Sequence, residues 1–162
     1  MKKINRRDFL SVSIASGAVF GFPSIVRGRN LNSRLCHACI GTGGKGRDDW
    51  NRLMSHDKID ICAACDIDTS HLKEIKARFP GIRLYQDWRE LFGKEGDRID
   101  SVNISTPDHM HTTIMTEALR RRKHVYCQKP LCRGLNECRL LREEAAKAGV
   151  VTEIGAQITG DG

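Results

Sequence analysis

Short apolar runs alternate with longer segments whose apolar residues recur every three or four positions, from residue 35 to residue 155. Runs of the first kind are typical of buried strands, and the recurrence in the second kind is typical of helices. Strands are predicted at residues 35–40, 59–65, 82–85, 99–105, 124–127 and 150–155. Helices are predicted between them, at residues 45–56, 69–79, 88–92, 110–121 and 135–148.

The predicted strands are apolar on both faces and are joined by predicted helices. Such strands belong in a parallel sheet that helices cover on both sides. We therefore predict an α/β fold, a Rossmann-type doubly wound parallel sheet of about six strands, over residues 35–162. A chain of 162 residues is long enough for one domain of this kind with a single core.

The helical spacing also predicts which side chains face the core, because residues three or four apart share one face of a helix. The predicted inward residues are Trp50, Leu53, Met54, Leu72, Ile75, Phe79, Leu135, Cys138, Leu141 and Ala145. At the end of the last helix, Gly149 is expected as the first residue beyond it.

A glycine-rich loop directly follows the first predicted strand. Its sequence, Gly-Thr-Gly-Gly-Lys-Gly, matches the dinucleotide-binding pattern at Gly41, Gly43 and Gly46. The first glycine permits a tight turn, the second permits close approach of a pyrophosphate, and the third permits close packing of the helix. With Gly44 beside it, the helix start then presents unpaired amides and a partial positive charge to the phosphates.

An acidic residue, Asp66, follows the second predicted strand, 25 positions after Gly41. A carboxylate at this place accepts hydrogen bonds from the ribose hydroxyls of the cofactor's adenosine. It also repels a 2′-phosphate, and no Arg or Lys follows it until Lys73. NAD is therefore the expected cofactor, and NADP is less favoured. Asp68 lies beyond the strand and is expected to cap the next helix.

Four stretches of the chain together resemble the Gfo/Idh/MocA family of glucose–fructose oxidoreductases and inositol dehydrogenases. Two of them are the glycine loop and the Cys-Asp pair that ends at Asp66. The others are Ser-Thr-Pro-Asp-His-Met-His at residues 105–111 and Lys-His-Val-Tyr-Cys-Gln-Lys-Pro-Leu at residues 123–131. The last two are far more specific than the glycine loop, and the likeness covers residues 34–157.

The resemblance implies an NAD(P)-dependent enzyme that transfers hydride between the nicotinamide and a sugar or polyol. It places Thr106 and Pro107 beside the nicotinamide ribose, with His109 and His111 flanking that loop. It also implies that Lys129 is the catalytic lysine, which contacts the reacting hydroxyl and lies beside the cofactor. The positions of these residues in the predicted fold agree with the resemblance. The loops that carry them follow the carboxyl ends of the fourth and fifth predicted strands, where open α/β sheets bind ligands. A lysine there stabilises a developing alkoxide.

The chain departs from the family pattern at two informative positions. Gln128 stands where the family usually has Glu. It can still bond to a ribose hydroxyl, and we count it among the cofactor-binding residues, but it lacks the charge that would partner Lys129. Arg122 stands where relatives often have Gly at a helix end. A left-handed backbone there would cost a non-glycine residue roughly 1–2 kcal/mol.

Residues 1–34 are typical of an export signal and linker. Arg6 and Arg7 precede Phe9-Leu10 and a weakly apolar stretch over residues 11–26. This arrangement resembles a twin-arginine signal, so a periplasmic or secreted protein is expected. An uncleaved signal that anchors the chain in the membrane is the alternative.

The formal net charge of +7 belongs mainly to this segment. Residues 1–34 contain seven of the 27 basic residues and only one of the 20 acidic residues. The rest of the chain is nearly balanced, so no nucleic-acid partner is predicted. No apolar run reaches the roughly 20 residues that a membrane span needs, so no stable span is predicted.

Seven cysteines include two Cys-x-x-Cys pairs, at residues 36–39 and 62–65, which are spaced like zinc ligands. Both pairs lie in predicted strands, where residues three apart point to opposite faces. Neither pair is therefore expected to bind a metal, and we expect small buried hydrophobic residues instead. The sequence identifies no partner for Cys132 or Cys138, and the odd count argues against a fully paired disulfide framework.

Family members carry a second α/β domain after the sixth strand, which supplies the substrate pocket. None follows within these 162 residues, so this chain alone is expected to bind NAD without turning over a substrate. Three interpretations stay open: half of a sugar or polyol oxidoreductase, half of an NAD-dependent glycosidase of the same family, and a non-catalytic nucleotide-binding remnant. Family members are often oligomers, but their subunit contacts lie mainly on the second domain, so an oligomer is an open alternative for this chain and not a prediction.

Overall fold

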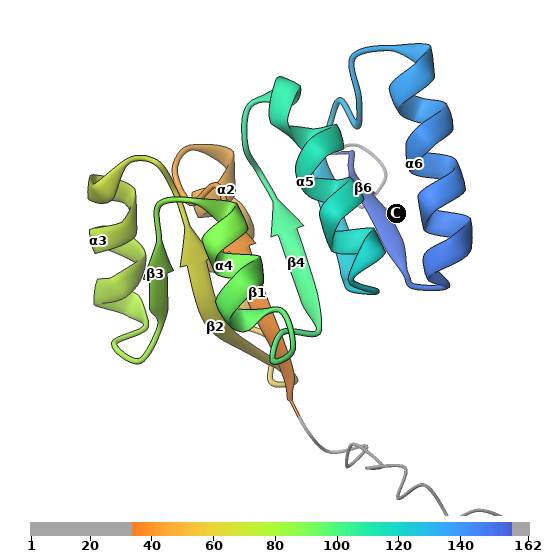
Figure 1. Cartoon of the computed structure of the whole chain (residues 1–162). Helices are drawn as coiled ribbons and strands as arrows, with labels where there is room; N and C mark the ends of the chain where they lie inside the picture. The colour runs from red at the N-terminus through yellow and green to blue at the C-terminus, as the bar shows by residue number, and fades with distance from the viewer. Residues whose placement is uncertain (1–33, 157–162) are drawn as a thin grey trace, which may run out of the picture. The chain divides into compact units, whose positions relative to one another are not determined.

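Within residues 34–156, which the structure describes, six parallel strands form one sheet in the order β3-β2-β1-β4-β5-β6 (Figure 1). The structure is a computed structural model. This order is the Rossmann order, so the predicted fold is confirmed. The strands are β1 (Leu35–Ile40), β2 (Ile59–Cys65), β3 (Arg83–Tyr85), β4 (Ser101–Ile104), β5 (His124–Gln128) and β6 (Thr152–Gly155). The helices are α2 (Lys45–Met54), α3 (Thr69–Arg78), α4 (Trp88–Glu95), α5 (Asp108–Arg120) and α6 (Leu135–Ala148).

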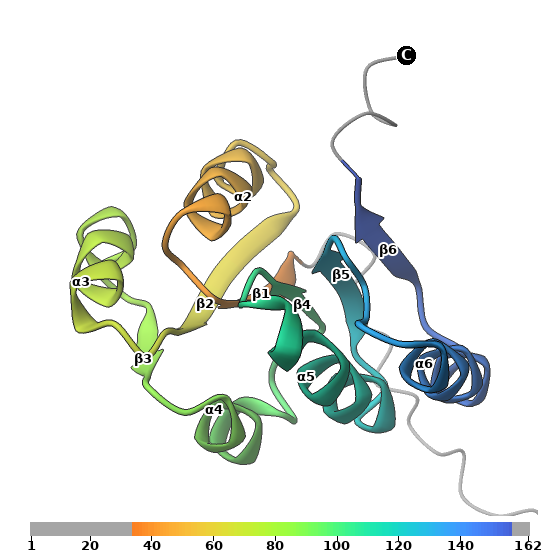
Figure 2. The ribbon, with the colours of Figure 1, turned by 90° about the horizontal axis from the view of Figure 1, so that it is seen from above.

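Helices cover both faces of the sheet, as Figure 2 shows from above: α2 and α3 lie on one face, and α4, α5 and α6 lie on the other. The α2–α3 side buries a cluster that includes Trp50 and Ile75. The opposite side buries a larger cluster that includes Ile104 of β4 and Ile114 of α5. The strands are therefore apolar on both faces over much of the sheet, as their sequence pattern predicts.

Several element boundaries differ from the prediction by two or three residues. The helix predicted from residue 110 begins at Asp108, directly after Pro107, and the helix predicted to end at residue 92 continues to Glu95. Apolar periodicity locates the buried part of a helix but not its polar first or last turn. Asp68 caps α3 as predicted, because its side chain accepts a hydrogen bond from the amide of Ser70.

Three predicted inward residues are wrong. Met54 is 45% exposed at the end of α2, Leu135 is 66% exposed at the start of α6, and Cys138 in the same first turn of α6 is also exposed. All three lie in terminal turns, where the neighbouring layer no longer covers the helix. In α6 only Leu141 is buried, because this helix packs mainly against α5. Gly149 follows α6 with a φ of 65°, as predicted.

The cysteines depart most from the prediction. Cys36 of β1 is bonded to Cys62 of β2, and Cys132 is bonded to Cys138. The register of β1 and β2 shifts between residues 37 and 38, which leaves Cys62 as an extra residue in β2. Because this irregularity shifts the alternation of faces, Cys62 and Cys65 both pack against the larger cluster instead of opposite faces.

The predicted export signal lies outside the described residues, apart from Arg34. Across residues 34–156, none of the helices combines the length and the apolar character that crossing a membrane requires.

Candidate functional site

The glycine loop joins the end of β1 to the start of α2, as predicted. Gly41 and Gly44 have positive φ angles of 83° and 48°, which glycine adopts without strain. A side chain at Gly41 would meet the carbonyl of Ser105, and one at Gly46 would overlap the carbonyl of Gly41. The loop therefore packs tightly against the end of β4 and the first turn of α2, and this packing requires glycine.

The carboxylate of Asp66, directly after β2, holds the same loop. Its Oδ2 accepts hydrogen bonds from the amides of Thr42 (2.7 Å) and Gly43 (3.2 Å). Its Oδ1 accepts one from the amide of Asp68 (2.9 Å). Burial alone would raise the pKa of Asp66, but the amide bonds and the nearby His71 outweigh it, so the pKa lies below 3.8. Asp66 is therefore a fixed negative charge beside the loop.

His71 of α3 lies over the loop, a position that the sequence does not predict. Its Nδ1 is 3.3 Å from Oδ2 of Asp66, and its Nε2 is 3.9 Å from Oδ2 of Asp68. A side chain at Gly43 would overlap the His71 ring, so Gly43 makes room for this ring. No motif marks His71 in the sequence, because only the turn from β2 into α3 brings it to the loop.

A cleft of about 650 Å³ opens beside the loop and Asp66, a volume typical of small-molecule and cofactor sites. In its lining, Thr106 Oγ1 and Trp88 Nε1 are buried and have no hydrogen-bond partner among residues 34–156. Buried polar atoms normally have a partner, so these two fit a ligand-binding surface. Six residues expected to bind the cofactor line the cleft: Gly41, Gly43, Asp66, Thr106, Pro107 and His109.

The start of α4 contributes cleft residues that the sequence analysis missed. The guanidinium of Arg89 lies over the Trp88 ring, 4.5 Å from its centroid, and its Nη1 lies 3.4 Å from Oδ1 of Asp87. Arg89 is distant from Asp66 in sequence, so only the fold reveals a cation near that carboxylate. The charged side chains of the lining are Asp66, Asp68, Asp87 and Arg89, together with His71 and His109.

The other residues predicted to bind or act on ligands do not line the cleft. Gly44 and Gly46 shape the turn into α2. Lys129 is the first residue after β5, and its exposed side chain has no ion-pair partner within the described part of the chain. Its place at the carboxyl edge of the sheet agrees with the prediction, but the structure does not bring it to the cleft.

His111, which is 1% exposed in α5, joins two loops. Its Nε2 lies 2.7 Å from the carbonyl oxygen of Thr106, and its Nδ1 lies 2.8 Å from that of Pro130. Because each ring nitrogen faces a carbonyl, the ring links the loop after β4 to the loop after β5. His111 is therefore a positioning residue.

Gln128, the last residue of β5, is buried and bonds to α2. Its Nε2 donates a hydrogen bond to Oδ2 of Asp49 at 2.8 Å. Ser105 Oγ donates to the same oxygen at 2.7 Å, and Lys45 Nζ donates to Oδ1 at 2.8 Å. The sequence relates Gln128 only to Lys129 and to the ribose. It does not point to Asp49, because an acid in an amphipathic helix is usually on the surface.

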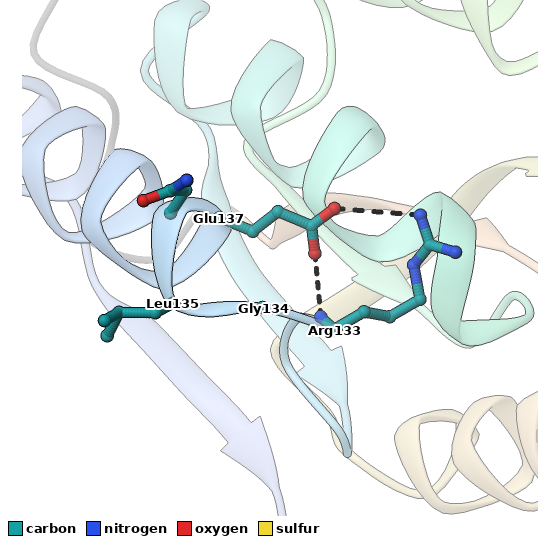
Figure 3. A pocket seen from close by; sticks show the side chains of 5 residues that line it. Arg133, Gly134, Leu135 and Glu137 are labelled. Carbon is teal, nitrogen blue, oxygen red and sulfur yellow. Dashed lines mark hydrogen bonds and ion pairs between the residues drawn. The ribbon is translucent and has the colours of Figure 1, made fainter.

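A second hollow lies at the start of α6 and is lined by residues 133–137 (Figure 3). There Glu137 accepts a hydrogen bond from the amide of Arg133 at 2.7 Å, and this bond contributes to a lowered pKa of Glu137. The helix start thus already has a carboxylate from its own chain. None of its lining residues borders the cleft beside the glycine loop, and it is not a second candidate site.

The glycine loop at a helix start, the neighbouring carboxylate and the Rossmann strand order together define a dinucleotide-binding domain. The sequence profile described as "Oxidoreductase family, NAD-binding Rossmann fold" (GFO_IDH_MocA) matches residues 36–156. The chain belongs to this family, and the resemblance seen in the sequence is confirmed at the level of its NAD-binding domain.

Individual relatives agree with this assignment. A myo-inositol 2-dehydrogenase of Thermotoga maritima is 28% identical over 72% of this chain and 34% of its own length. An inositol 2-dehydrogenase of Acidothermus cellulolyticus is 30% identical over 72% of this chain and 34% of its own length. The crystal structure of GenD2 from gentamicin A biosynthesis, in complex with NAD, is 26% identical. It matches with a TM-score of 0.70 over 83% of this chain and 37% of that protein. This chain thus spans about a third of these relatives.

Proposed function

We propose that this domain holds NAD for hydride transfer at a hydroxyl or carbonyl carbon of a sugar or polyol. The observation that carries the proposal is the joint placement of the glycine loop and Asp66 at one cleft. The relatives named above are inositol dehydrogenases and an NAD complex, which supports the same chemistry. The activity belongs to the whole protein, of which these residues supply the cofactor-binding part.

The residues present fit the cofactor. The start of α2 offers backbone amides and a partial positive charge to the pyrophosphate. Asp66 offers acceptor oxygens to the adenosine ribose, and its lowered pKa keeps it ionised at neutral pH. Thr106 offers an unpartnered hydroxyl in the same cleft. The bound nicotinamide supplies hydride transfer, and Lys129 stabilises the developing alkoxide on the substrate oxygen and moves its proton.

NAD is preferred to NADP in this proposal. A 2′-phosphate on the adenosine ribose would lie beside the carboxylate of Asp66, and Asp68 and Asp87 add negative charge to the same cleft. Arg89 contributes a guanidinium to the cleft lining, but its Nη1 already contacts Asp87. Negative charges in the same cleft repel the phosphate and oppose its binding.

The proposal is tested by titrating NADH into the full chain and following its fluorescence. Asp66→Asn removes the negative charge and is expected to weaken NADH binding about tenfold or more, or about 1.4 kcal/mol. Asp57→Asn is the matched control, because this side chain is 88% exposed and lies away from the cleft. Wild-type protein that fails to bind NADH, or Asp66→Asn that binds as well as wild type, would contradict the proposal.

We also propose that the protein is exported by the twin-arginine route. The support is the sequence alone, with Arg6 and Arg7 before an apolar stretch. Replacing both arginines with lysine is expected to retain the protein in the cytoplasm, measured by cell fractionation. Unchanged export of the Arg6→Lys, Arg7→Lys double variant would refute this route.

A further inference from the structure

Asp49 lies where a carboxylate is costly. Its side chain is 5% exposed on α2, and a buried carboxylate is tolerated only when charge and hydrogen bonds compensate it. Lys45 supplies the charge, at 2.8 Å from Oδ1. Ser105 Oγ and Gln128 Nε2 both donate to Oδ2. Three donors on one buried carboxylate indicate that Asp49 holds the segments that supply them in place.

The donors come from three segments at the carboxyl edge of the sheet. Ser105 directly precedes Thr106, Gln128 directly precedes Lys129, and Lys45 opens α2. One oxygen of Asp49 therefore joins the loop after β4 to the loop after β5. The packing leaves little freedom, because a side chain on Gly155 would come within 2.8 Å of the Gln128 amide.

We propose that Asp49 and Gln128 form a matched acid–amide pair that positions the loops of Thr106 and Lys129 relative to each other. Position 128 requires an amide in this chain because position 49 carries the acid. Acids at both positions would place two carboxylates about 3 Å apart, and such a pair retains a shared proton well above the usual carboxyl range. The inference rests on the proposed function only where NADH binding is used to measure it.

The first test is Gln128→Glu in the full chain, with NADH affinity and thermal unfolding measured at about pH 5.5 and about pH 8. At about pH 8 the two carboxylates repel, and we expect NADH affinity about tenfold below wild type together with a lower Tm. At about pH 5.5 the shared proton removes the repulsion, and affinity within about threefold of wild type is expected.

The second test exchanges the two groups. In the double variant Asp49→Asn, Gln128→Glu, the amide at 49 can donate to the acid at 128, so affinity and Tm at about pH 8 should return to within about threefold and about 3 °C of wild type. A merely steric role would show neither the pH dependence nor this rescue. Asp57→Asn, which removes an exposed acid, should match wild type at both pH values.

The proposal is overturned if Gln128→Glu equals wild type at about pH 8, or if the double variant is no better than Gln128→Glu. Failure of wild type to bind NADH would instead contradict the proposed function. The pair is then judged by Tm alone, where the same loss and the same rescue are expected.

Discussion

Arg122 adopts a backbone conformation that glycine would adopt more easily. Its φ is 56° just beyond α5, and its amide donates to the carbonyl of Leu119 at 2.8 Å. The sequence predicts strain at Arg122 if its backbone is left-handed, and the structure confirms that it is. A side chain there costs roughly 1–2 kcal/mol.

Arg122→Gly is therefore expected to raise the free energy of unfolding. The gain should be about 0.5–1 kcal/mol, because glycine also gives the unfolded chain more freedom. Chemical denaturation followed by circular dichroism measures it. Arg122→Ala retains the Cβ atom and should show no comparable gain, and an equal gain in both variants would contradict the strain argument.

His37 makes the stability of the fold depend on pH. It is 4% exposed, and its ring nitrogens lie 2.8 Å from Ser101 Oγ and 3.1 Å from Asn103 Oδ1. Burial lowers the pKa of His37 from 6.5 to about 4, although the bond with Asn103 opposes the shift. Between these values the unfolded chain binds a proton that the folded chain does not, so stability falls as the pH falls.

Lowering the pH from about 7 to about 5 should reduce the free energy of unfolding by about 2 kcal/mol through His37 alone. His37→Gln preserves hydrogen-bonding capacity without a titrating ring, so its stability should change less over the same interval. Denaturation curves at both pH values provide the measurement. Parallel losses in wild type and variant would show that His37 is not responsible.

Single residues also show where sequence reasoning succeeds and fails. Gly41 and Gly46 were recognised because a loop between a strand and a helix has local requirements that a short motif records. Asp49 was missed because it acts on Gln128, 79 positions away in sequence. His71 is only five positions from Asp66, but the turn from β2 into α3 is what brings its ring to that carboxylate. Helical periodicity assigns such polar residues to a solvent face.

Among the elements, β1 and β2 are joined by a covalent bond that neither strand pattern predicts. The irregularity at Cys62 brings its sulfur to that of Cys36, 26 positions earlier. Cys132 and Cys138 are only six positions apart and join the loop after β5 to α6. A bond that closes a longer loop restricts the unfolded chain more.

The double variant Cys36→Ala, Cys62→Ala is expected to lose about 3 kcal/mol of stability, against about 2 kcal/mol for Cys132→Ala, Cys138→Ala. Urea denaturation without reductant measures both losses. Adding reductant should bring wild type close to the variants. A smaller loss for the longer loop would refute the ranking.

Apolar periodicity predicts the boundaries of some elements more closely than those of others. The boundaries of β1, β2 and α6 agree with the prediction, whereas α4 and α5 extend into polar residues. Burial fixes the middle of an element, and local capping by residues such as Asp87 fixes its ends. Capping residues are hard to identify in a sequence unless a clear helical pattern follows them.

For the whole molecule, cofactor binding should appear as added stability. A ligand that binds only the folded chain stabilises it by about 2.7 kcal/mol at a hundredfold excess over Kd. We expect NAD to raise the Tm of the full chain by several degrees, and NADP to raise it less at equal concentration. The smaller effect of NADP is expected because the acidic lining of the cleft repels its 2′-phosphate. A larger rise in Tm with NADP than with NAD would reverse the cofactor assignment. In Asp66→Asn the two rises in Tm should differ less.

The sequence by itself determined the alternation of strands and helices along the chain, the glycine loop and the acid that follows the second strand. These features depend on local rules, because apolar runs, helical spacing and tight turns are each set within a few residues. Tertiary structure alone decided that His71 and Arg89 reach the cleft, that Cys36 bonds to Cys62, and that Gln128 pairs with Asp49. Each of these contacts joins side chains from separate elements, and their approach depends on register and helix rotation, which no local pattern contains.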